Sequence, residues 1–201
     1  DFAWAREQSF AMVSDDVDWC FWLDDDDVIE GAQWLRQLAY SAPAELDGYV
    51  MFYDYARDEH GNNVCQLWRE RLIRRDRGYM WKGAVHEVLV PPPGRAAVFA
   101  TVGKEQISYI HNRPASRYEP DRNLRILLGE KEQAEADGGQ ASPRCIAYLG
   151  TEYMAKGEWA EAARYLEQYI AHPEALWGDE RSQVYHKLAS CLRALGNAQA
   201  A

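Results

Sequence analysis

The chain has 201 residues, of which 47% are hydrophobic and 27% are charged, and its formal net charge is −10. This length is enough for one large domain or for two small ones. The acidic balance argues against a nucleic-acid-binding protein, because neutralising phosphate groups needs clustered Lys and Arg side chains. We therefore expect a small or neutral partner.

Four cysteines lie far apart in the sequence and form no C-x-x-C pair: Cys20, Cys65, Cys145 and Cys191. This spacing argues against a zinc knuckle or a redox motif, so we expect reduced, buried thiols. No apolar run approaches the ~20 residues that a membrane span needs, and the N-terminus lacks the basic and apolar blocks of a signal peptide. These features predict a cytoplasmic protein that does not span a membrane.

The first half of the chain alternates helical and strand-like patterns, as in an α/β domain. Residues 1–13 carry apolar side chains at helical spacings, and residues 19–23 form an aromatic-rich run typical of a strand covered on both faces. A helix is expected over residues 28–41. The β-branched and aromatic content of residues 48–53 predicts a second strand.

Further strands are expected after a turn at residues 59–62, which contain glycine and asparagine. Residues 64–75 and 79–90 are predicted to be strands, and the proline-rich segment 91–94 breaks the chain before a last strand near 98–110. The pattern predicts a mixed sheet with an antiparallel tail.

The composition changes after about residue 116, where the chain becomes rich in Ala, Glu, Leu and Arg and has no strand-like run. We expect a domain boundary between His111 and Pro120, with an α/β domain over residues 1–115 and an all-α domain over residues 116–201. Two helices of the second domain have recognisable ends. Ser142 is the expected N-cap of the first of them, and Pro143 is its first helical residue. Gly157 is expected to end that helix, and Trp159 to begin the next one.

A repeat within this region matches the tetratricopeptide pattern, in which small residues let two antiparallel helices approach and large residues fill the gap. The matching positions are Leu149, Gly150, Tyr153, Gly157, Ala162 and Leu166. Three of these recur at a constant offset, as Leu188, Leu192 and Gly196. Because an uncapped array leaves apolar surface at its end, we expect a longer natural chain, or association with a protein partner or a second copy.

Four consecutive aspartates follow the first predicted strand, at Asp24, Asp25, Asp26 and Asp27. Ligands of α/β folds bind at the carboxyl ends of the strands. Because alternate residues of an extended segment point the same way, Asp24 and Asp26 are expected to bind one divalent cation through oxygen. Asp27, with Glu30 three residues later, fits a capping box of the following helix, and Asp25 has no assigned role. The alternative is that these acids only solvate a loop.

Five segments, in order and spacing, give the chain a family resemblance. Residues 22–27 (WLDDDD) are similar to the W-L-D-A-D-D segment of inverting family-2 glycosyltransferases of the GT-A type, and residues 2–6 (FAWAR) resemble the F-x-x-A-R stretch before it. Residues 71–75 (RLIRR) and 81–87 (WKGAVHE) resemble the R-L-F-R and W-x-G-x-V-H-E motifs of the bacterial branch that carries tetratricopeptide repeats. Ile110 and His111 are similar to the late I-x-H motif of the same bacterial branch.

The resemblance covers nearly the whole chain, although Glu7 replaces an asparagine of the family. It implies a GT-A fold and inverting transfer of a sugar from a nucleotide-diphosphate donor to a hydroxyl of a glycan, lipid or protein. Asp24 would then face the ribose and the metal, and Asp26 would bind the Mg or Mn ion that bridges the diphosphate and acts as a Lewis acid. His111 is the candidate third metal ligand or phosphate contact, since imidazole suits Mn. The alternative for His111 is a structural role.

An inverting transfer needs a base that takes the proton of the acceptor hydroxyl. The resemblance makes Glu87 the candidate, and His86 is able to replace Glu87 or to orient it. The alternative for Glu87 is an ion pair with an arginine such as Arg71 or Arg74.

Two further residues are candidates for donor binding. Arg6 is expected to contact the diphosphate, with a surface salt bridge as the alternative. Trp81 is a candidate for stacking on a sugar ring, with burial in the core as the alternative.

In this family a first strand and the nucleotide-base pocket precede the segment that resembles residues 2–6, so the resemblance implies that the N-terminal part of the catalytic domain is missing. Two functions stay open. One is a transferase, and the other is a non-catalytic protein-binding module whose helical repeat recognises a partner while the acidic site is vestigial. A metal-dependent phosphotransferase is a weaker alternative, because the sequence has neither a G-x-x-x-x-G-K-[ST] loop nor an H-E-x-x-H helix.

Overall fold

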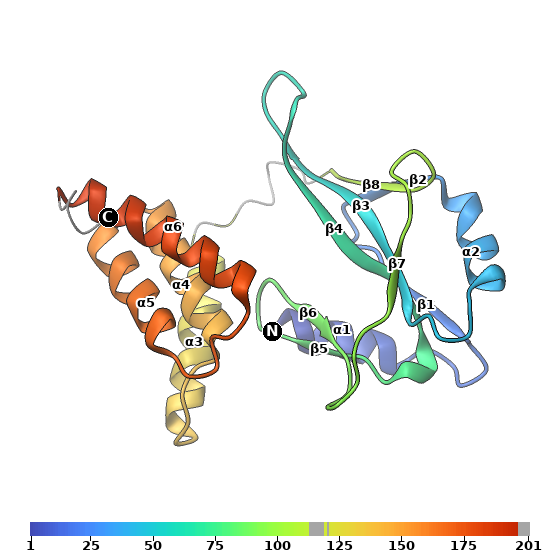
Figure 1. Cartoon of the computed structure of the whole chain (residues 1–201), viewed down its shortest axis with the longest axis horizontal. Coiled ribbons are helices and arrows are strands. Elements are labelled where there is room, and N and C mark those ends of the chain that lie inside the picture. The colour runs from blue at the N-terminus through green and yellow to red at the C-terminus, as the bar shows by residue number, and fades with distance from the viewer. Residues whose placement is uncertain (113–118, 120, 197–201) are drawn as a thin grey trace. The chain divides into compact units, whose positions relative to one another are not determined.

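A computed structural model describes residues 1–112, 119 and 121–196. The chain is a mixed α/β protein that forms two compact units (Figure 1). We name them by their ranges: the sheet unit comprises residues 5–82 and 88–118, and the helical unit comprises residues 1–4, 83–87 and 119–201. Segment 83–87 therefore belongs to the helical unit, although the strands on either side of it belong to the sheet unit.

Within the described residues, the sheet unit contains a six-stranded mixed sheet and a two-stranded ribbon of β5 and β6. The main sheet has the order β1-β4-β3-β8-β2, and β7 also pairs with β3. Strand β3 runs antiparallel to β4 and parallel to β7 and β8. The bounds are α1 (Phe2–Ala11), β1 (Trp19–Phe21), β2 (Asp27–Glu30), η1 (Ala32–Trp34), α2 (Leu35–Ser41), β3 (Gly48–Arg57), β4 (Asn63–Arg74), η2 (Arg75–Arg77), β5 (Met80–Lys82), β6 (Val88–Val90), β7 (Phe99–Thr101) and β8 (Ser108–His111).

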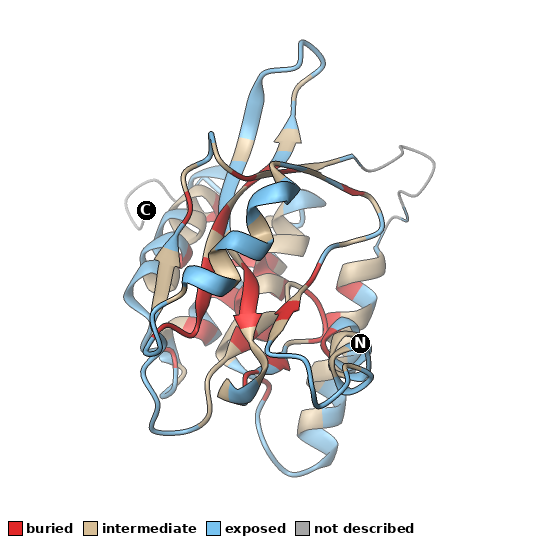
Figure 2. Ribbon diagram, turned by 90° about the vertical axis from the view of Figure 1, so that its right-hand side faces the viewer, coloured by how far each residue is buried: buried red, intermediate tan, exposed pale blue. Residues whose placement is uncertain are grey.

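The core of the sheet unit is built mainly on β3 and the segments that pair with it. Its buried members are Leu46, Tyr49, Met51, Tyr53, Leu72, Val102, Ile107 and Tyr109. Figure 2 shows buried segments along the middle of the sheet, whereas the tip of the β3–β4 hairpin is exposed. This core fixes β3 and β8, the two strands that carry Tyr53 and His111.

The predicted strand at residues 19–23 is confirmed as β1, and its predicted coverage on both faces holds in part. Strand β1 lies at the edge of the main sheet, antiparallel to β4. Cys20 is buried, whereas Trp19 and Phe21 are only half-buried. Alternate residues of a strand face opposite sides of the sheet, so one side of β1 remains more accessible.

The predicted helix over residues 28–41 is wrong in its first part. Val28 and Ile29 lie in β2, where they pair with Ile110 and Tyr109 of β8. Both are β-branched residues, which fit a pleated sheet better than a helix. Gly31, with φ of +81°, ends the strand, and helical structure begins only at residue 32.

Gly31 also lies against the neighbouring backbone, because a Cβ at this position would come within 1.9 Å of the Gln106 carbonyl oxygen. Gly61 has nearly the same φ, +82°, with nothing within 4 Å of its Cβ position. We expect Gly61→Ala to lower the free energy of unfolding by about 1 kcal/mol, the cost of a left-handed alanine. Gly31→Ala should cost at least about 2 kcal/mol more, because a neighbouring strand connection must move. Chemical denaturation checks both values, and equal losses would contradict the close approach.

The remaining strand predictions hold in part. Strand β3, strand β4 and the turn between them are confirmed. Residues 79–90 and 98–110 each form two short strands instead of one. In the first case the chain leaves the ribbon at Gly83, whose φ is +96°, and returns to it at Val88.

The helical unit contains α3 (Arg122–Ala136), α4 (Pro143–Ala155), α5 (Trp159–Ala171) and α6 (Gly178–Ala194). The predicted ends of α4 are confirmed: the Ser142 hydroxyl accepts a hydrogen bond from the Cys145 backbone N–H at 3.2 Å, and Pro143 is the first helical residue. Gly157 follows the helix with φ of +74°, and Trp159 begins α5. Both ends of α4 therefore follow the capping chemistry that the sequence contains.

Gly150 shows why small residues are needed between α4 and α5. A Cβ there would lie 2.8 Å from the Leu166 side chain and 3.3 Å from the Ala162 carbonyl oxygen. Gly196, with φ of +79°, follows α6 as Gly157 follows α4. The helical pairing is therefore confirmed, and its assignment to the tetratricopeptide family stays a prediction.

No helix in the described part of the chain is both long and apolar enough to cross a lipid bilayer. All four cysteines are free; Cys65 is half-buried and the other three are buried. Burial raises the pKa of the Cys145 thiol to about 12, so this thiol stays protonated at neutral pH.

Candidate functional site: a carboxylate and histidine cluster

The acidic segment and His111 meet because β2 and β8 pair antiparallel, with Asp27 opposite His111. The Asn112 backbone N–H donates to the Asp26 carbonyl oxygen at 2.7 Å, which continues this pairing by one residue. Asp26 is the last residue before β2, and His111 is the last residue of β8. Two segments far apart in sequence thus bring their side chains to one edge of the sheet.

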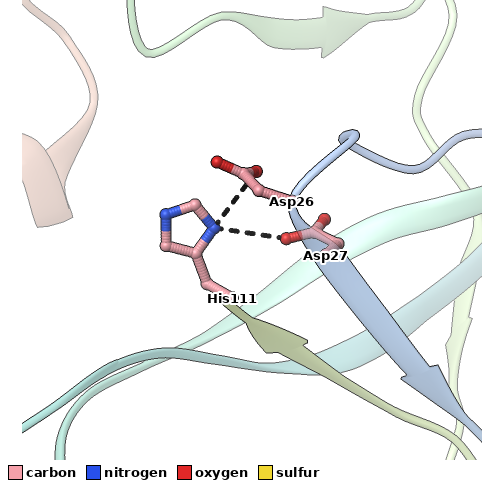
Figure 3. Close-up of side chains that lie close together, drawn as sticks. All are labelled: Asp26, Asp27 and His111. Atoms are coloured by element: carbon pink, nitrogen blue, oxygen red, sulfur yellow. Dashed lines mark hydrogen bonds and ion pairs between the residues drawn. The ribbon is translucent and has the colours of Figure 1, made fainter. Parts of the chain in front are cut away.

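Asp26, Asp27 and His111 form a cluster with the spacing of metal ligands (Figure 3). His111 Nδ1 lies 3.6 Å from Asp26 Oδ1 and 3.4 Å from Asp27 Oδ1, and one ligand atom from each residue lies within 4.8 Å of the others. Their side chains are 18%, 15% and 0% exposed for His111, Asp26 and Asp27. Among the described residues this is the cluster of His, Cys, Asp and Glu side chains able to hold a metal ion. Two carboxylate oxygens and one imidazole nitrogen suit Mn²⁺ or a similar divalent cation.

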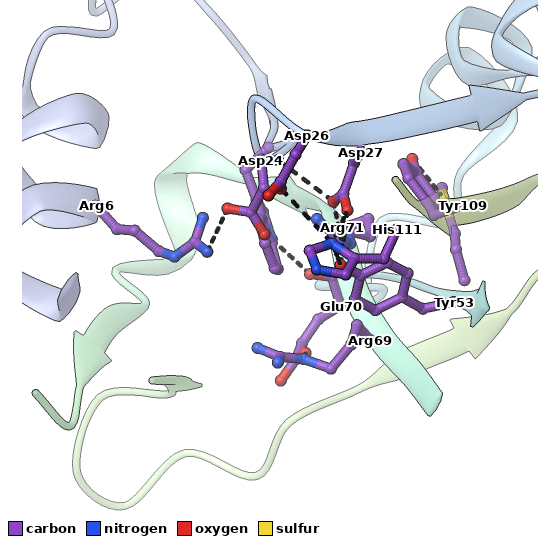
Figure 4. Close-up of polar contacts among 12 residues, drawn as sticks. Arg6, Asp24, Asp26, Asp27, Tyr53, Arg69, Glu70, Arg71, Tyr109 and His111 are labelled. Atoms are coloured by element: carbon purple, nitrogen blue, oxygen red, sulfur yellow. Dashed lines mark hydrogen bonds and ion pairs between the residues drawn. The ribbon is translucent and has the colours of Figure 1, made fainter. Parts of the chain in front are cut away.

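Asp27 is not a helix cap, so that prediction is wrong. Its residue lies in β2, and its buried carboxylate joins a network of side chains (Figure 4). The Tyr53 hydroxyl donates to Asp27 Oδ1 at 2.6 Å and also lies 3.1 Å from His111 Nδ1. The Asp24 backbone N–H donates to Asp27 Oδ2 at 3.4 Å. Burial raises the pKa of Tyr53, and its hydrogen bond to Asp27 raises it further, so this hydroxyl stays a donor.

Arg71 supplies the positive charge beneath this network. Its side chain is fully buried, and one terminal nitrogen lies 3.0 Å from Asp27 Oδ2. The angles are outside the hydrogen-bond range, so the guanidinium nitrogens make no hydrogen bond within the described residues. The guanidinium instead packs on Trp22, Tyr53 and Tyr109, with its carbon 3.8, 4.5 and 4.8 Å from the three ring centroids. Arg71 therefore acts on Asp27 through charge at short range.

Asp24 has a different partner from the one that the sequence suggested. Its Oδ1 accepts a hydrogen bond from Arg6 at 2.6 Å, and it is not one of the three clustered residues. Arg6 packs over Trp22 and Trp81, 4.4 and 5.0 Å from their ring centroids. Trp81 is only 4% exposed and makes an edge contact with Trp22, which places it in the core. Arg6 thus forms a salt bridge with Asp24, which is the alternative given above to a contact with the diphosphate.

A hollow of about 400 Å³ is lined by α1, by β1 and by the two residues that follow β1. Its lining residues are Arg6, Ser9, Phe10, Val13, Trp19, Cys20, Phe21, Trp22 and Leu23. The volume falls within the range of small-molecule sites. The lining ends at Leu23, directly before Asp24, so the hollow adjoins the acidic segment along the chain.

The other residues singled out from the sequence, His86 and Glu87, belong to the helical unit. His86 has φ of +53°, and its ring stacks on Tyr148 of α4 with centroids 4.1 Å apart. The two arginines suggested as partners of Glu87 are engaged as follows: Arg71 pairs with Asp27, and Arg74 donates to the carbonyl oxygens of Ala42, Pro43 and Leu46.

A scan against models of known protein families finds no match, and a search of characterised proteins finds no significantly similar sequence.

Proposed function

We propose that the chain binds a divalent metal and the diphosphate of a nucleotide sugar, as part of a glycosyltransferase that moves the sugar to an acceptor hydroxyl with inversion. The observation that carries this proposal is the convergence of Asp26, Asp27 and His111 at one sheet edge, with ligand atoms within 4.8 Å of one another. The resemblance of residues 22–27 to the acidic motif of family-2 glycosyltransferases supports the same reading.

The donor atoms fit Mg²⁺ or Mn²⁺. Asp26 and Asp27 offer carboxylate oxygens, which hard cations prefer, and the His111 nitrogen favours Mn²⁺. When bound, such an ion stabilises the negative charge of the departing diphosphate. Tyr53 and Arg71 hold the Asp27 carboxylate on its other sides, so Asp27 would offer the ion only the lone pairs that they leave.

Arg6 and Asp24 are the candidates for holding the nucleotide part of the donor. The Arg6 guanidinium packs against two indole rings, a contact that reduces the freedom the side chain loses when it binds phosphate. When the nucleotide sugar binds, the Asp24 carboxylate would release Arg6 and accept a hydrogen bond from a hydroxyl of that nucleotide sugar. The resemblance of residues 81–87 alone assigns the base that takes the acceptor proton to Glu87 or His86.

Calorimetric titration of the full chain tests the proposal. We expect MnCl₂ to bind, and uridine diphosphate to bind only when Mn²⁺ is present, because the ion bridges protein and diphosphate. Asp26→Asn should abolish both, since an amide is a poor ligand for this ion. Asp76→Asn, at a largely exposed aspartate of η2, is the matched control and should change neither. Absence of both binding events at millimolar ligand would reject the proposal.

A second assay separates sugar transfer from phosphoryl transfer. Incubation with a nucleotide sugar and Mn²⁺ should release the nucleoside diphosphate together with free sugar or a glycoside. Release of inorganic phosphate or a sugar phosphate as the first product would favour the phosphotransferase alternative instead.

A further inference from the structure

The helical unit binds a short segment of its own chain, residues 83–87. Val85 is 4% exposed and belongs to the same buried cluster as residues of α3, α4 and α5. The Ala84 backbone N–H donates to Glu130 Oε2 of α3 at 3.1 Å, and its carbonyl oxygen accepts the Phe2 N–H at 2.9 Å. The segment is therefore fixed by side-chain burial and by backbone hydrogen bonds, as a bound peptide would be.

Arg144 of α4 recognises the backbone of this segment. Its Nε and one terminal nitrogen donate to the His86 carbonyl oxygen at 3.4 and 3.1 Å. The same side chain donates to the Tyr148 hydroxyl at 3.2 Å and pairs with Glu180 of α6 at 3.0 Å. Two donors on one carbonyl fix the peptide plane that follows His86, and the helices supply the anchor.

His86 has a backbone conformation that needs such an anchor. Its φ of +53° is unusual for a residue with a side chain, and within the described chain only Asp121 among non-glycine residues also has positive φ. Strained conformations of this kind persist where the surroundings determine them, and they concentrate at functional positions. The strain at His86 is thus balanced by the Arg144 contact and by the Tyr148 stack.

The imidazole also lies near a carboxylate of α4. His86 Nε2 lies 4.0 Å from Glu152 Oε1, and Asn123 of α3 donates to that oxygen at 3.3 Å. Interaction with His86 lowers the pKa of Glu152, with a further contribution from Asn123, so Glu152 is ionised at neutral pH. The His86 side chain stays 35% exposed, which leaves it accessible to a second molecule.

We infer that the helical unit acts as an internal clamp, in which Arg144, Tyr148 and Glu152 hold the His86–Glu87 loop in one conformation. The clamp does not rest on the proposed glycosyltransferase function. On this view the ligand of the helical surface is the chain's own loop rather than a foreign peptide.

Hydrogen exchange of the full chain tests the clamp. In Arg144→Met the amides of residues 83–87 should exchange at least about tenfold faster, because a hydrogen bond to a charged group shifts a local opening equilibrium by that factor. Glu180→Gln is the matched control: it weakens the Arg144–Glu180 pair but leaves the two bonds to the His86 carbonyl oxygen, so loop exchange should be unchanged. Exchange within α4 and α5 should stay slow in both variants.

Tyr148→Leu provides a second route, should Arg144→Met fail to fold. It removes the ring that stacks on His86, so the nuclear Overhauser contact of His86 with residue 148 should weaken and loop exchange should rise. Unchanged loop exchange in both folded variants would overturn the inference. Arg144→Lys should restore slow loop exchange only in part, since lysine cannot make the paired contact.

The two proposals fail in different ways. If the wild-type chain does not bind Mn²⁺, the glycosyltransferase proposal falls, and the exchange data still decide whether the clamp exists. If Mn²⁺ binds but loop exchange is the same in wild type, Arg144→Met and Tyr148→Leu, the clamp is overturned and the metal site stands.

Discussion

Replacing Arg71 with methionine is expected to lower the free energy of unfolding by about 3–5 kcal/mol. The Asp27 side chain is fully buried, and Arg71 is the cation beside it, at 3.0 Å. Without Arg71 that carboxylate would remain charged inside the sheet unit or would have to take up a proton, and either change is costly. The packing of the guanidinium on Trp22 would also be lost. Urea denaturation followed by fluorescence measures the change.

The charge explanation is separable from the packing explanation by a double variant. Arg71→Met with Asp27→Asn removes both charges, and we expect more than half of the lost stability to return. Arg36→Met, at an exposed arginine on α2, is the control and should change stability by less than about 0.5 kcal/mol. If the double variant is as unstable as Arg71→Met alone, loss of aromatic packing is the main cause.

Replacing His111 with alanine is expected to weaken Mn²⁺ binding by about 100-fold, because the site loses its nitrogen ligand and keeps only carboxylates. Asp24→Asn should change Mn²⁺ affinity by less than about threefold, since Asp24 pairs with Arg6 and lies outside the cluster. Calorimetry or electron paramagnetic resonance of free Mn²⁺ gives both values.

This pair of variants decides between two ligand sets. The sequence reading assigns the metal to Asp24, Asp26 and His111, and the observed cluster replaces Asp24 with Asp27. A large effect of Asp24→Asn on metal binding, with a small effect of His111→Ala, would contradict the cluster. Circular dichroism of each variant ensures that lost binding is not lost folding.

Local patterns predicted much of the fold. The cap at Ser142, the terminating Gly157 and the long strand around residue 50 follow from short-range preferences, which the sequence displays directly. The failure at residues 28–30 has a long-range cause. Val28 and Ile29 are extended because β8 pairs with them, and β8 lies 80 residues away. A helical spacing alone does not reveal such a partner.

The candidate site shows the same division. The acidic run and His111 attract attention because carboxylates and imidazole are metal ligands, but the role of Asp27 depends on the register between β2 and β8. Tyr53 was missed altogether, since a tyrosine within an aromatic strand looks like any core residue. Its one distinguishing signal is its place on β3 beside Tyr109 of β8, which only a prediction of strand pairing would supply.

If the cluster binds a metal ion as proposed, the pairing of Asp27 with His111 would tie metal binding to folding. These residues are 84 positions apart, so an ion held by both joins the start and the end of most of the sheet unit. An unfolded chain offers no such pair, and any ion that binds only the folded form shifts the folding equilibrium by mass action. The folded chain would then gain stability as the concentration of free divalent metal rises above the dissociation constant of the site.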